Sequence, residues 1–310
     1  MDTEVLVIGE ALIDIVEGDR GVRELVGGSP ANVAVGLARQ GHGVSLLTRL
    51  GRDDRGERIA AQLEGQGHEG AGLEIDEASW TDAPTSTARA RLQPDGSARY
   101  EFEIDWDVPV ARRDGIRALH TGSIALFLEP GGTAVLDALQ HASSSAFVSL
   151  DPNIRPALVG PHAEALERFE RAAALADLVK LSDEDAEWLY PGLPGADVLT
   201  RVAGLGEAGD AGGVALARLV VMTRGGEGAI GLGPGGIAEV PAIAVTVADT
   251  IGAGDAYMAS LISSALDDPA MCEDAVAFTL ALRRAAVMAG ITVSRAGANP
   301  PTRAEVNAAL

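Results

Sequence analysis

The amino-acid sequence predicts one α/β domain with a mainly parallel sheet, to which a small antiparallel β-sheet is attached. Short apolar stretches with the character of strands alternate with helical patterns along most of the chain. Such alternation is typical of a parallel sheet with helices on both faces. Residues 85–103 alternate with period two around Asp95-Gly96, which predicts a hairpin. No Ser/Pro-rich linker or internal repeat divides the 310 residues, so we expect a single domain over residues 1–310.

The individual elements follow from local patterns. A strand is predicted at 4–8, and a helix begins at Ser29-Pro30, where Ser29 can cap the first turn and Pro30 needs no amide partner. The other predicted elements are strands at 44–50, 118–121, 146–150, 178–181 and 219–223, helices at 57–63, 133–141, 162–174 and 196–205, a hairpin at 229–240, and helices between 253 and 290.

Composition excludes several classes of partner. The formal net charge of −21 repels nucleic acid and anionic membranes, so we expect neither as a partner. No run of about 18 apolar residues is free of charge, and the acidic N-terminus does not match a signal peptide. We therefore expect a cytoplasmic protein without a transmembrane helix. The single cysteine, Cys272, predicts no internal disulfide, and the five histidines lack the spacing of a zinc site.

The segment at residues 249–255 gives the strongest indication of a catalytic site. Gly252 and Gly254 stand at the start of a predicted helix, where backbone amides and the helix dipole favour an anion. Asp255 in the first turn can accept a proton from an attacking hydroxyl beside a transferring phosphoryl group. The alternative is a glycine-rich turn in which Asp255 only stabilises the helix.

Further glycine-rich or polar segments flank predicted strands. Gly27-Gly28 precede a capped helix whose first turn carries Asn32, a side chain suited to sugar hydroxyls. Thr223 to Gly228 follow a strand at the edge where open α/β sheets bind ligands. Asp14 and residues 151–156 also follow strands. Each of these segments could alternatively be a turn without a ligand.

Together these segments resemble the PfkB, or ribokinase-like, family of sugar kinases, in the family's order and over nearly the whole chain. Residues 27–32 resemble its N-terminal signature, residues 249–255 its D-T-x-G-A-G-D signature, and residues 223–228 its T-x-G-x-x-G nucleotide loop. The resemblance implies a three-layer α/β/α sandwich with a mainly parallel sheet and a small β lid. The lid would comprise residues 15–26 and 85–107, close over the sugar and exclude water. Its exposed edge could also form a homodimer.

The resemblance also implies a role for particular residues, with ATP and Mg²⁺ as cofactors and K⁺ in some members. Asp255 would be the base for the sugar's primary hydroxyl, and amides of Gly252, Ala253 and Gly254 would hold the phosphoryl charge. The implied sugar-binding residues are Asp14, Gly27, Gly28, Asn32, Arg89, Asn153 and Arg155. The implied nucleotide-binding residues are Ser182, Thr223, Gly225, Gly226, Gly228 and Gly254. A monovalent cation would be held by Asp249, Ile251, Ser294 and Gly297.

One segment departs from the family pattern. The family often carries N-x-x-E after the strand that here ends at Leu181, and that motif acts on magnesium and phosphate. Ser182 and Asp185 stand at this spacing here, so Asp185 is the implied Mg²⁺ ligand, with Glu184 and Glu187 as nearby alternatives.

The substrate implied by the resemblance is D-fructose, phosphorylated by ATP to fructose 6-phosphate, because residues 9–14, 151–156 and 295–303 are similar to the fructokinase branch. A 2-keto-3-deoxygluconate kinase is the first alternative, since Arg155 could read a carboxylate, and a ribose kinase is the second. A different class is a sugar- or nucleotide-binding regulator without turnover. A nicotinamide-dependent oxidoreductase is disfavoured, because Gly9-Glu10-Ala11-Leu12 lacks the G-x-G-x-x-G pattern.

Overall fold

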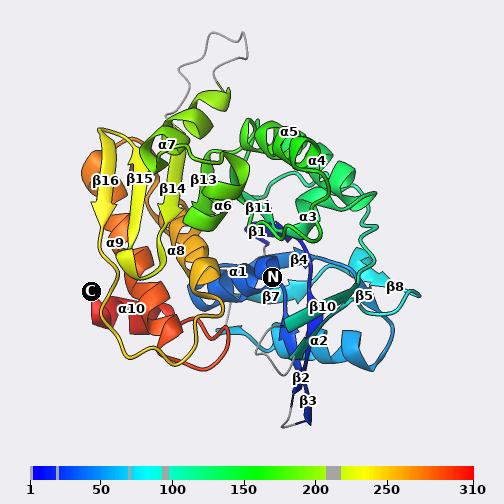
Figure 1. Cartoon of the computed structure of the whole chain (residues 1–310). Coiled ribbons are helices and arrows are strands. Elements are labelled where there is room, and N and C mark those ends of the chain that lie inside the picture. The colour runs from blue at the N-terminus through cyan, green and yellow to red at the C-terminus, as the bar shows by residue number, and fades with distance from the viewer. Residues whose placement is uncertain (1–2, 19–20, 69–70, 93–97, 207–217) are drawn as a thin grey trace.

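The computed structural model describes residues 3–18, 21–68, 71–92, 98–206 and 218–310. A ten-stranded sheet runs through the molecule with helices on both of its faces (Figure 1). Its strand order is β16-β15-β14-β13-β12-β11-β1-β4-β7-β6. Neighbours from β14 to β7 pair in parallel, whereas β15, β16 and β6 add antiparallel pairs at the two sides. The predicted three-layer α/β/α architecture is therefore confirmed.

The strands of this sheet are short and mostly buried. They are β1 (Val5–Ile8), β4 (Val44–Leu47), β6 (Gly67–His68), β7 (Ala71–Ile75), β11 (Ala118–Gly122), β12 (Phe147–Asp151), β13 (Leu178–Ser182), β14 (Leu219–Thr223), β15 (Ala229–Gly233) and β16 (Gly236–Val240). β1 shows why such strands form. Val5 and Val7 face one apolar core and Leu6 and Ile8 face the other, so both faces of the strand are covered.

The helices form two layers that bury these two cores. One layer contains α1 (Ser29–Arg39), α2 (Asp54–Glu64), α8 (Ala253–Asp267), α9 (Ala275–Val293) and α10 (Arg303–Ala309). The opposite layer contains α3 (Ile124–Phe127), α4 (Gly131–Ala142), α5 (His162–Ala173), α6 (Asp183–Leu189) and α7 (Gly195–Ala203). The sequence analysis did not predict α3, α6 or α10, which are short.

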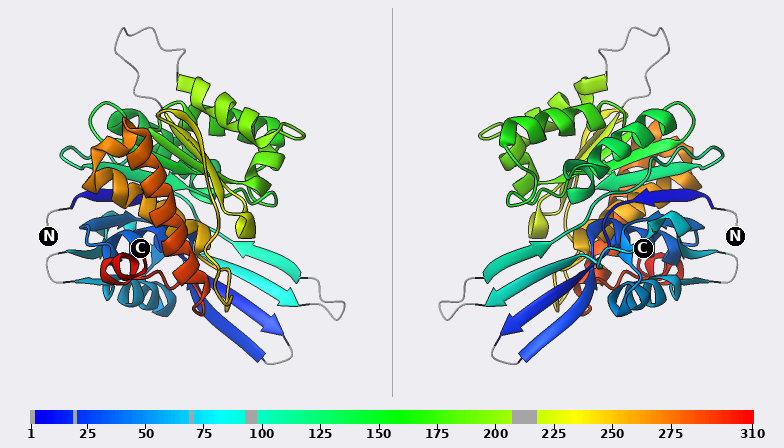
Figure 2. Two further views of the ribbon diagram at one scale, coloured as in Figure 1. Left: turned by 90° about the vertical axis from the view of Figure 1, so that its left-hand side faces the viewer. Right: turned by 90° about the vertical axis from the view of Figure 1, so that its right-hand side faces the viewer.

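A second sheet stands apart from the main body (Figure 2). It has the order β10-β9-β2-β3, with β2 (Leu12–Gly18), β3 (Gly21–Gly27), β9 (Thr87–Leu92) and β10 (Ala98–Glu103). β2 continues from the end of β1 after three residues, so this sheet is attached where the main sheet's parallel strands end. The predicted hairpin turn at Asp95-Gly96 lies outside the described residues. A two-stranded ribbon, β5 (Leu50–Gly51) with β8 (Trp80–Thr81), lies beside it.

α9 is the one helix in the described ranges that is long and apolar enough, by length and composition only, to cross a membrane. Half of its most apolar 18-residue window is buried within the protein, and a core helix meets the same criterion. Arg283 and Arg284 lie at its middle, and it packs against α8 and the β15–β16 hairpin.

Candidate active site

The candidate site lies where β1, β12, β13 and β14 end and where α1 and α8 begin. Open parallel sheets bind ligands at this edge. α1 begins differently from the prediction, because Gly28 and not Ser29 is the N-cap residue. Gly28 has φ 119°, and a Cβ atom there would lie 2.2 Å from the carbonyl oxygen of Glu10. Ser29 is thus the first helical residue, and its hydroxyl is free for a different partner.

That partner is Asp255 in the first turn of α8. The Ser29 hydroxyl donates to Asp255 Oδ1 at 2.6 Å, and Asn32 Nδ2 donates to Asp255 Oδ2 at 2.8 Å. Asn32 was predicted as a sugar-binding residue; its amide group contacts the predicted base, and its role in sugar binding remains a prediction. Burial raises the pKa of Asp255, while these two hydrogen bonds and the charges of Lys180 and Arg155 lower it. The site therefore contains a half-buried, oriented carboxylate.

The turn before α8 has the geometry of an anion site. Gly252 is the N-cap residue in the left-handed region, with φ 77°, and a Cβ there would lie 2.7 Å from Ala298 Cβ. Amides in the first turn of a helix lack intrahelical acceptors and favour negative groups. The Ala253 amide has a long hydrogen bond of 3.3 Å to the carbonyl of Thr250. Gly252 and Gly254 are thus the stronger candidates to hold a phosphoryl group.

Arg155 acts electrostatically on several acidic residues of the site, including the predicted sugar-binding residue Asp14. Burial raises the pKa of Glu10, Asp14 and Asp255, and the charge of Arg155 lowers the pKa of each of them. Gly27 packs directly against Asp14, since a Cβ at Gly27 would lie 2.0 Å from Asp14 Oδ2. Three carboxyl groups thus lie within electrostatic range of one guanidinium.

Two residues beside this group have backbone angles that are unusual for side chains with a Cβ. Ser123 follows β11 with φ 54°, and Asn153 follows β12 with φ 37°. Such conformations cost about 1–3 kcal/mol and tend to occur at functional sites. Asparagine tolerates this region better than most other residues do, which is consistent with an asparagine at position 153.

Arg89 lies on the small sheet, on strand β9. It forms an ion pair with Glu17 of β2. Its side chain is about one-third exposed, and the register pairs it with Ile15. The role of Arg89 in sugar binding remains a prediction.

The predicted nucleotide loop connects β14 to β15. Thr223 ends β14 directly beside Ser182, the last residue of β13, and Gly225–Glu227 form a short 3₁₀ helix. Gly225 and Gly228 have φ of 49° and 91°, and a Cβ at Gly228 would lie 2.1 Å from the carbonyl oxygen of Val240. Added Cβ atoms at Gly225 and Gly226 would meet nothing within 4 Å, so this backbone faces open space that a ligand can approach.

The side chains of Ser182 and Asp185 serve to begin α6. They form a capping box, in which Ser182 Oγ accepts from the Asp185 amide at 3.0 Å and Asp185 Oδ2 accepts from the Ser182 amide at 2.8 Å. Asp185 Oδ1 accepts from the Ile154 amide at 2.6 Å. Both oxygens of Asp185 are therefore engaged, and among the described residues no group of three or more His, Cys, Asp or Glu side chains could hold a metal ion. Asp185 does not fit the role of a direct Mg²⁺ ligand.

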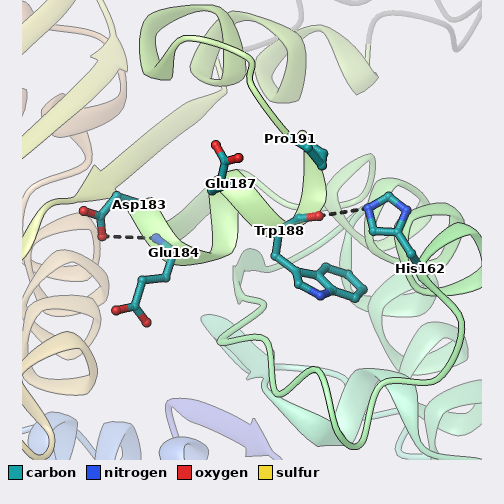
Figure 3. Close-up of a pocket in the computed structure, with 6 residues that line it drawn as sticks. All are labelled: His162, Asp183, Glu184, Glu187, Trp188 and Pro191. Atoms are coloured by element: carbon teal, nitrogen blue, oxygen red, sulfur yellow. Dashed lines mark hydrogen bonds between the residues drawn. The ribbon is translucent and has the colours of Figure 1, made fainter.

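The other acidic residues of this segment line a different surface. Asp183, Glu184 and Glu187 lie on the outer side of α6, on a cavity of about 730 Å³ that also contacts His162, Trp188 and Pro191 (Figure 3). Asp255 does not line this cavity. The rings of His162 and Trp188 lie 4.8 Å apart, and the imidazole Nε2 is 2.9 Å from the carbonyl oxygen of Trp188. This cavity lies beside the candidate active site rather than within it.

The predicted monovalent-cation residues come together around Asp249. Its Oδ1 accepts from the Ile251 amide at 3.1 Å, and its Oδ2 accepts from the Gly297 amide at 3.0 Å. These amides lower the pKa of Asp249. The hydroxyl of Ser294 donates to the carbonyl of Ile291 instead. The two predicted segments are adjacent, and cation binding there remains a prediction.

Three residues of the site were not predicted: Ser29 as a partner of Asp255, Glu10 and Lys180. Glu10 is only 6% exposed, and burial raises its pKa to about 7. Lys180 Nζ lies 2.9 Å from Asp151 Oδ2 in a buried ion pair. The signals that could have indicated the last two are an acidic residue shortly after an apolar strand and a lysine within one.

Comparison with known proteins agrees with the family resemblance that the sequence motifs indicated. Residues 2–305 match the family described as pfkB family carbohydrate kinase. A fructokinase from Rhizobium leguminosarum bv. trifolii is 33% identical over 276 residues, which cover 84% of this chain and 79% of the relative.

Two solved structures have the same fold over almost their full length. A fructokinase from Xylella fastidiosa with bound ATP has a TM-score of 0.81 and 26% identity, over 98% of this chain and 97% of that one. A fructokinase from Vibrio cholerae O395 in a form with bound fructose, ADP and calcium ion also has a TM-score of 0.81 and 26% identity, over 99% and 98% of the two chains. With the family match spanning nearly the whole sequence, the protein belongs to the pfkB family of carbohydrate kinases.

Proposed function

We propose that the protein transfers the γ-phosphoryl group of ATP to the primary hydroxyl of D-fructose, giving fructose 6-phosphate and ADP. The observation that carries this proposal is the Asp255 carboxylate, held by Ser29 and Asn32 beside the Gly252–Gly254 turn. The fructokinase relatives, and the neighbours that bind ATP or fructose and ADP, support the choice of substrates.

The reaction needs little covalent chemistry from the protein. The sugar hydroxyl oxygen forms a bond to the γ-phosphorus, the bond between that phosphorus and the β,γ-bridging oxygen breaks, and the hydroxyl proton passes to Asp255. Amides at Gly252 and Gly254 stabilise the negative charge on the phosphoryl oxygens. Magnesium would enter with ATP, since it usually binds through nucleotide phosphates and water with one or two protein carboxylates.

A neutral sugar suits the site better than a sugar acid. Glu10, Asp14 and Asp255 lie within electrostatic range of Arg155, so the site holds several acidic groups beside one guanidinium. A substrate carboxylate would be repelled by these groups. This favours fructose over 2-keto-3-deoxygluconate, while ribose remains to be excluded by experiment.

Three further parts of the proposal concern the molecule as a whole. The small sheet of β2, β3, β9 and β10 would act as a lid that closes over the sugar within a single domain of residues 1–310. Two copies would associate through this sheet. The protein would work in the cytoplasm, where ATP is supplied.

The test is an ADP-coupled assay with purified protein and a panel of fructose, ribose and 2-keto-3-deoxygluconate. We expect turnover with fructose and a fall of about 10²–10⁴-fold in kcat for Asp255→Asn. Asp197→Asn is the matched control, because Asp197 is an exposed aspartate in the first turn of α7. Activity retained by Asp255→Asn would refute the base assignment, and sugar binding without turnover would indicate a regulator.

A further inference from the structure

Lys180 is chemically unique in this chain. Of the 24 lysine and arginine residues, 23 are arginine and one is lysine. That lysine is not on the surface, where solubility would favour a charge, but is 3% exposed in the central strand β13. The chain therefore uses lysine only at a position that is buried beside the active site.

The position of the ammonium group explains the choice of residue type. Lys180 Nζ lies 2.9 Å from Asp151 Oδ2 on the neighbouring strand β12. A Cβ atom placed on Gly254 would lie 3.4 Å from Nζ, and apart from the adjacent residues and the backbone of α8 no other described atom lies within 4 Å. Lysine presents a compact point charge, whereas arginine carries a broad planar fork. The space between β12 and the first turn of α8 thus fits an ammonium group.

This packing also determines which member of the Lys180–Asp151 ion pair lies closer to the first turn of α8. Since no Asp151 atom comes within 4 Å of the Cβ position at Gly254, the ammonium of Lys180 is nearer to that turn than its carboxylate partner is. Asp255 directly follows Gly254. The buried ion pair is therefore oriented with its positive end toward Gly254 in the first turn of α8, and its ammonium acts electrostatically on Asp255.

Other charged groups around Lys180 come from each neighbouring element. Asp185 of α6 is tied to the loop after β12 by its bond to the Ile154 amide, and His120 of β11 bonds to Ser149 Oγ at 3.0 Å. Burial, with the nearby Lys180 charge, lowers the pKa of His120 to about 3, so this ring is neutral. The charged groups that remain are Lys180 and Arg155 as cations, and Asp151, Asp185 and Asp255 as carboxylates.

We propose that Lys180 is a positioning residue of the phosphoryl-transfer site, whose buried ammonium, anchored by Asp151 beneath Gly254, keeps a fixed positive charge under Asp255 and the first turn of α8. It acts on Asp255 by favouring the carboxylate form that accepts the proton. It also adds positive potential where the phosphoryl group gains negative charge. Burial lowers the pKa of Lys180, but the charge and hydrogen bond of Asp151 and the charges of Asp185 and Asp255 together outweigh it, so the pKa is raised and the ammonium stays protonated.

The kinetic test uses Lys180→Met together with Asp151→Asn, because removing one member of a buried pair leaves the other charge without a partner. We expect the double variant to fold, with a kcat about tenfold or more below that of the wild type, because the fixed positive charge is lost. We also expect the acidic limb of its kcat/KM profile to move to higher pH, since Asp255 then protonates more readily. A double variant with the kcat and pH profile of the wild type would show that Lys180 only stabilises the fold.

A second test uses the fact that the chain has one lysine. Protein labelled with ¹³C-lysine should give one side-chain Cε signal by NMR, which reports directly on Lys180. We expect Asp255→Asn to shift this signal and Asp197→Asn to leave it unchanged. A Cε signal that does not respond to Asp255→Asn would overturn the proposal.

The inference rests on the proposed kinase function, and the two can fail separately. If wild-type protein phosphorylated no sugar in the panel, the proposed function would be wrong, while the NMR response would still measure the coupling of Lys180 to Asp255. If wild-type protein were active and neither the double variant nor the Cε signal behaved as expected, only the role of Lys180 would be wrong.

Discussion

At the scale of single residues, the site depends on side chains that are far apart in the sequence but meet at one carboxylate. Ser29 and Asp255 are separated by 226 residues, yet the Ser29 hydroxyl donates the shorter of the two hydrogen bonds that orient the base, and Asn32 donates the other. A hydroxyl and an amide that both donate to a carboxylate favour its ionised form. They therefore counter the effect of burial, which raises the pKa of Asp255.

Glu10 is an acidic residue whose loss of hydration on burial is only partly offset by hydrogen bonds and nearby charge. It is 6% exposed, and its Oε2 has no hydrogen-bond partner in the part of the chain that the structure describes. Its folded-state pKa of about 7 exceeds the ordinary value of 4.5. Folding thus binds a proton between these pH values. The stability contribution of Glu10 is complete below pH 4.5 and is lost as the pH rises through 7.

Glu10→Gln should therefore stabilise the protein at alkaline pH. We expect a free energy of unfolding up to about 3 kcal/mol higher than wild type at pH 8, and a difference near zero at pH 4.5. Urea unfolding at both pH values measures this. The control is Glu167→Gln, at an exposed position on α5. An equal difference at both pH values would show that Glu10 is not a buried titrating group in the folded protein.

At the scale of elements, α1 and α8 begin with the same local structure. Each has a glycine N-cap residue with positive φ, and the first turn of each carries residues of the site. Gly28 cannot carry a side chain, because a Cβ would lie 2.2 Å from the Glu10 carbonyl oxygen. The angle at which α1 leaves the sheet is thus fixed by backbone contact, and with it the positions of Ser29 and Asn32.

Gly28→Ala should consequently damage both stability and activity. We expect a loss of about 1–3 kcal/mol in the free energy of unfolding, from strain at a positive φ, and a large fall in kcat as Ser29 and Asn32 shift away from Asp255. Urea unfolding and the ADP-coupled assay measure the two effects. Gly204→Ala is the control, since Gly204 ends α7 with φ −72° and an open Cβ position. If Gly28→Ala matched this control, α1 would not need its glycine.

Elements were predicted well where periodicity is strong and poorly where it is weak. The parallel strands are short, mainly apolar runs buried on both faces, so β12, β13 and β14 were recognisable from composition even though β13 contains Lys180. α6 has seven residues and begins with three acidic ones, and therefore shows no apolar stripe. Its only sequence signal is the Ser182-x-x-Asp185 spacing, which was interpreted as a ligand motif although the structure uses it as a capping box.

The site was predictable to the extent that it depends on local backbone geometry. Gly252, Gly28 and Gly228 were all identified by their spacing before strands or helices, and each has a positive φ. Contacts between distant segments could not be predicted in this way. The ion pair of Lys180 with Asp151 requires β12 and β13 to be adjacent and in register, which only the folded sheet specifies.

At the scale of the whole molecule, the small sheet leaves an unusual surface exposed. β3 is an edge strand of that sheet, and its Val22 and Leu25 are 63% and 47% exposed. Exposed apolar edge strands pair with other chains unless charge or cover prevents it. The net charge of −21 opposes association at long range, but salt at physiological strength screens charges beyond about 8 Å. A second copy of the chain can therefore cover this edge.

We expect the protein in 0.15 M salt to have twice its monomer mass of 31.7 kDa by light scattering. Val22→Lys with Leu25→Lys should give a monomer, because lysine on an edge strand prevents pairing. Ile237→Lys is the matched control, as Ile237 is 54% exposed on β16, the edge strand of the main sheet. A monomeric wild type, or a dimer that only Ile237→Lys disrupts, would rule out association through the lid. If the monomeric variant also bound fructose more weakly, the dimer contact would stabilise the lid over the sugar, because both functions use the same sheet.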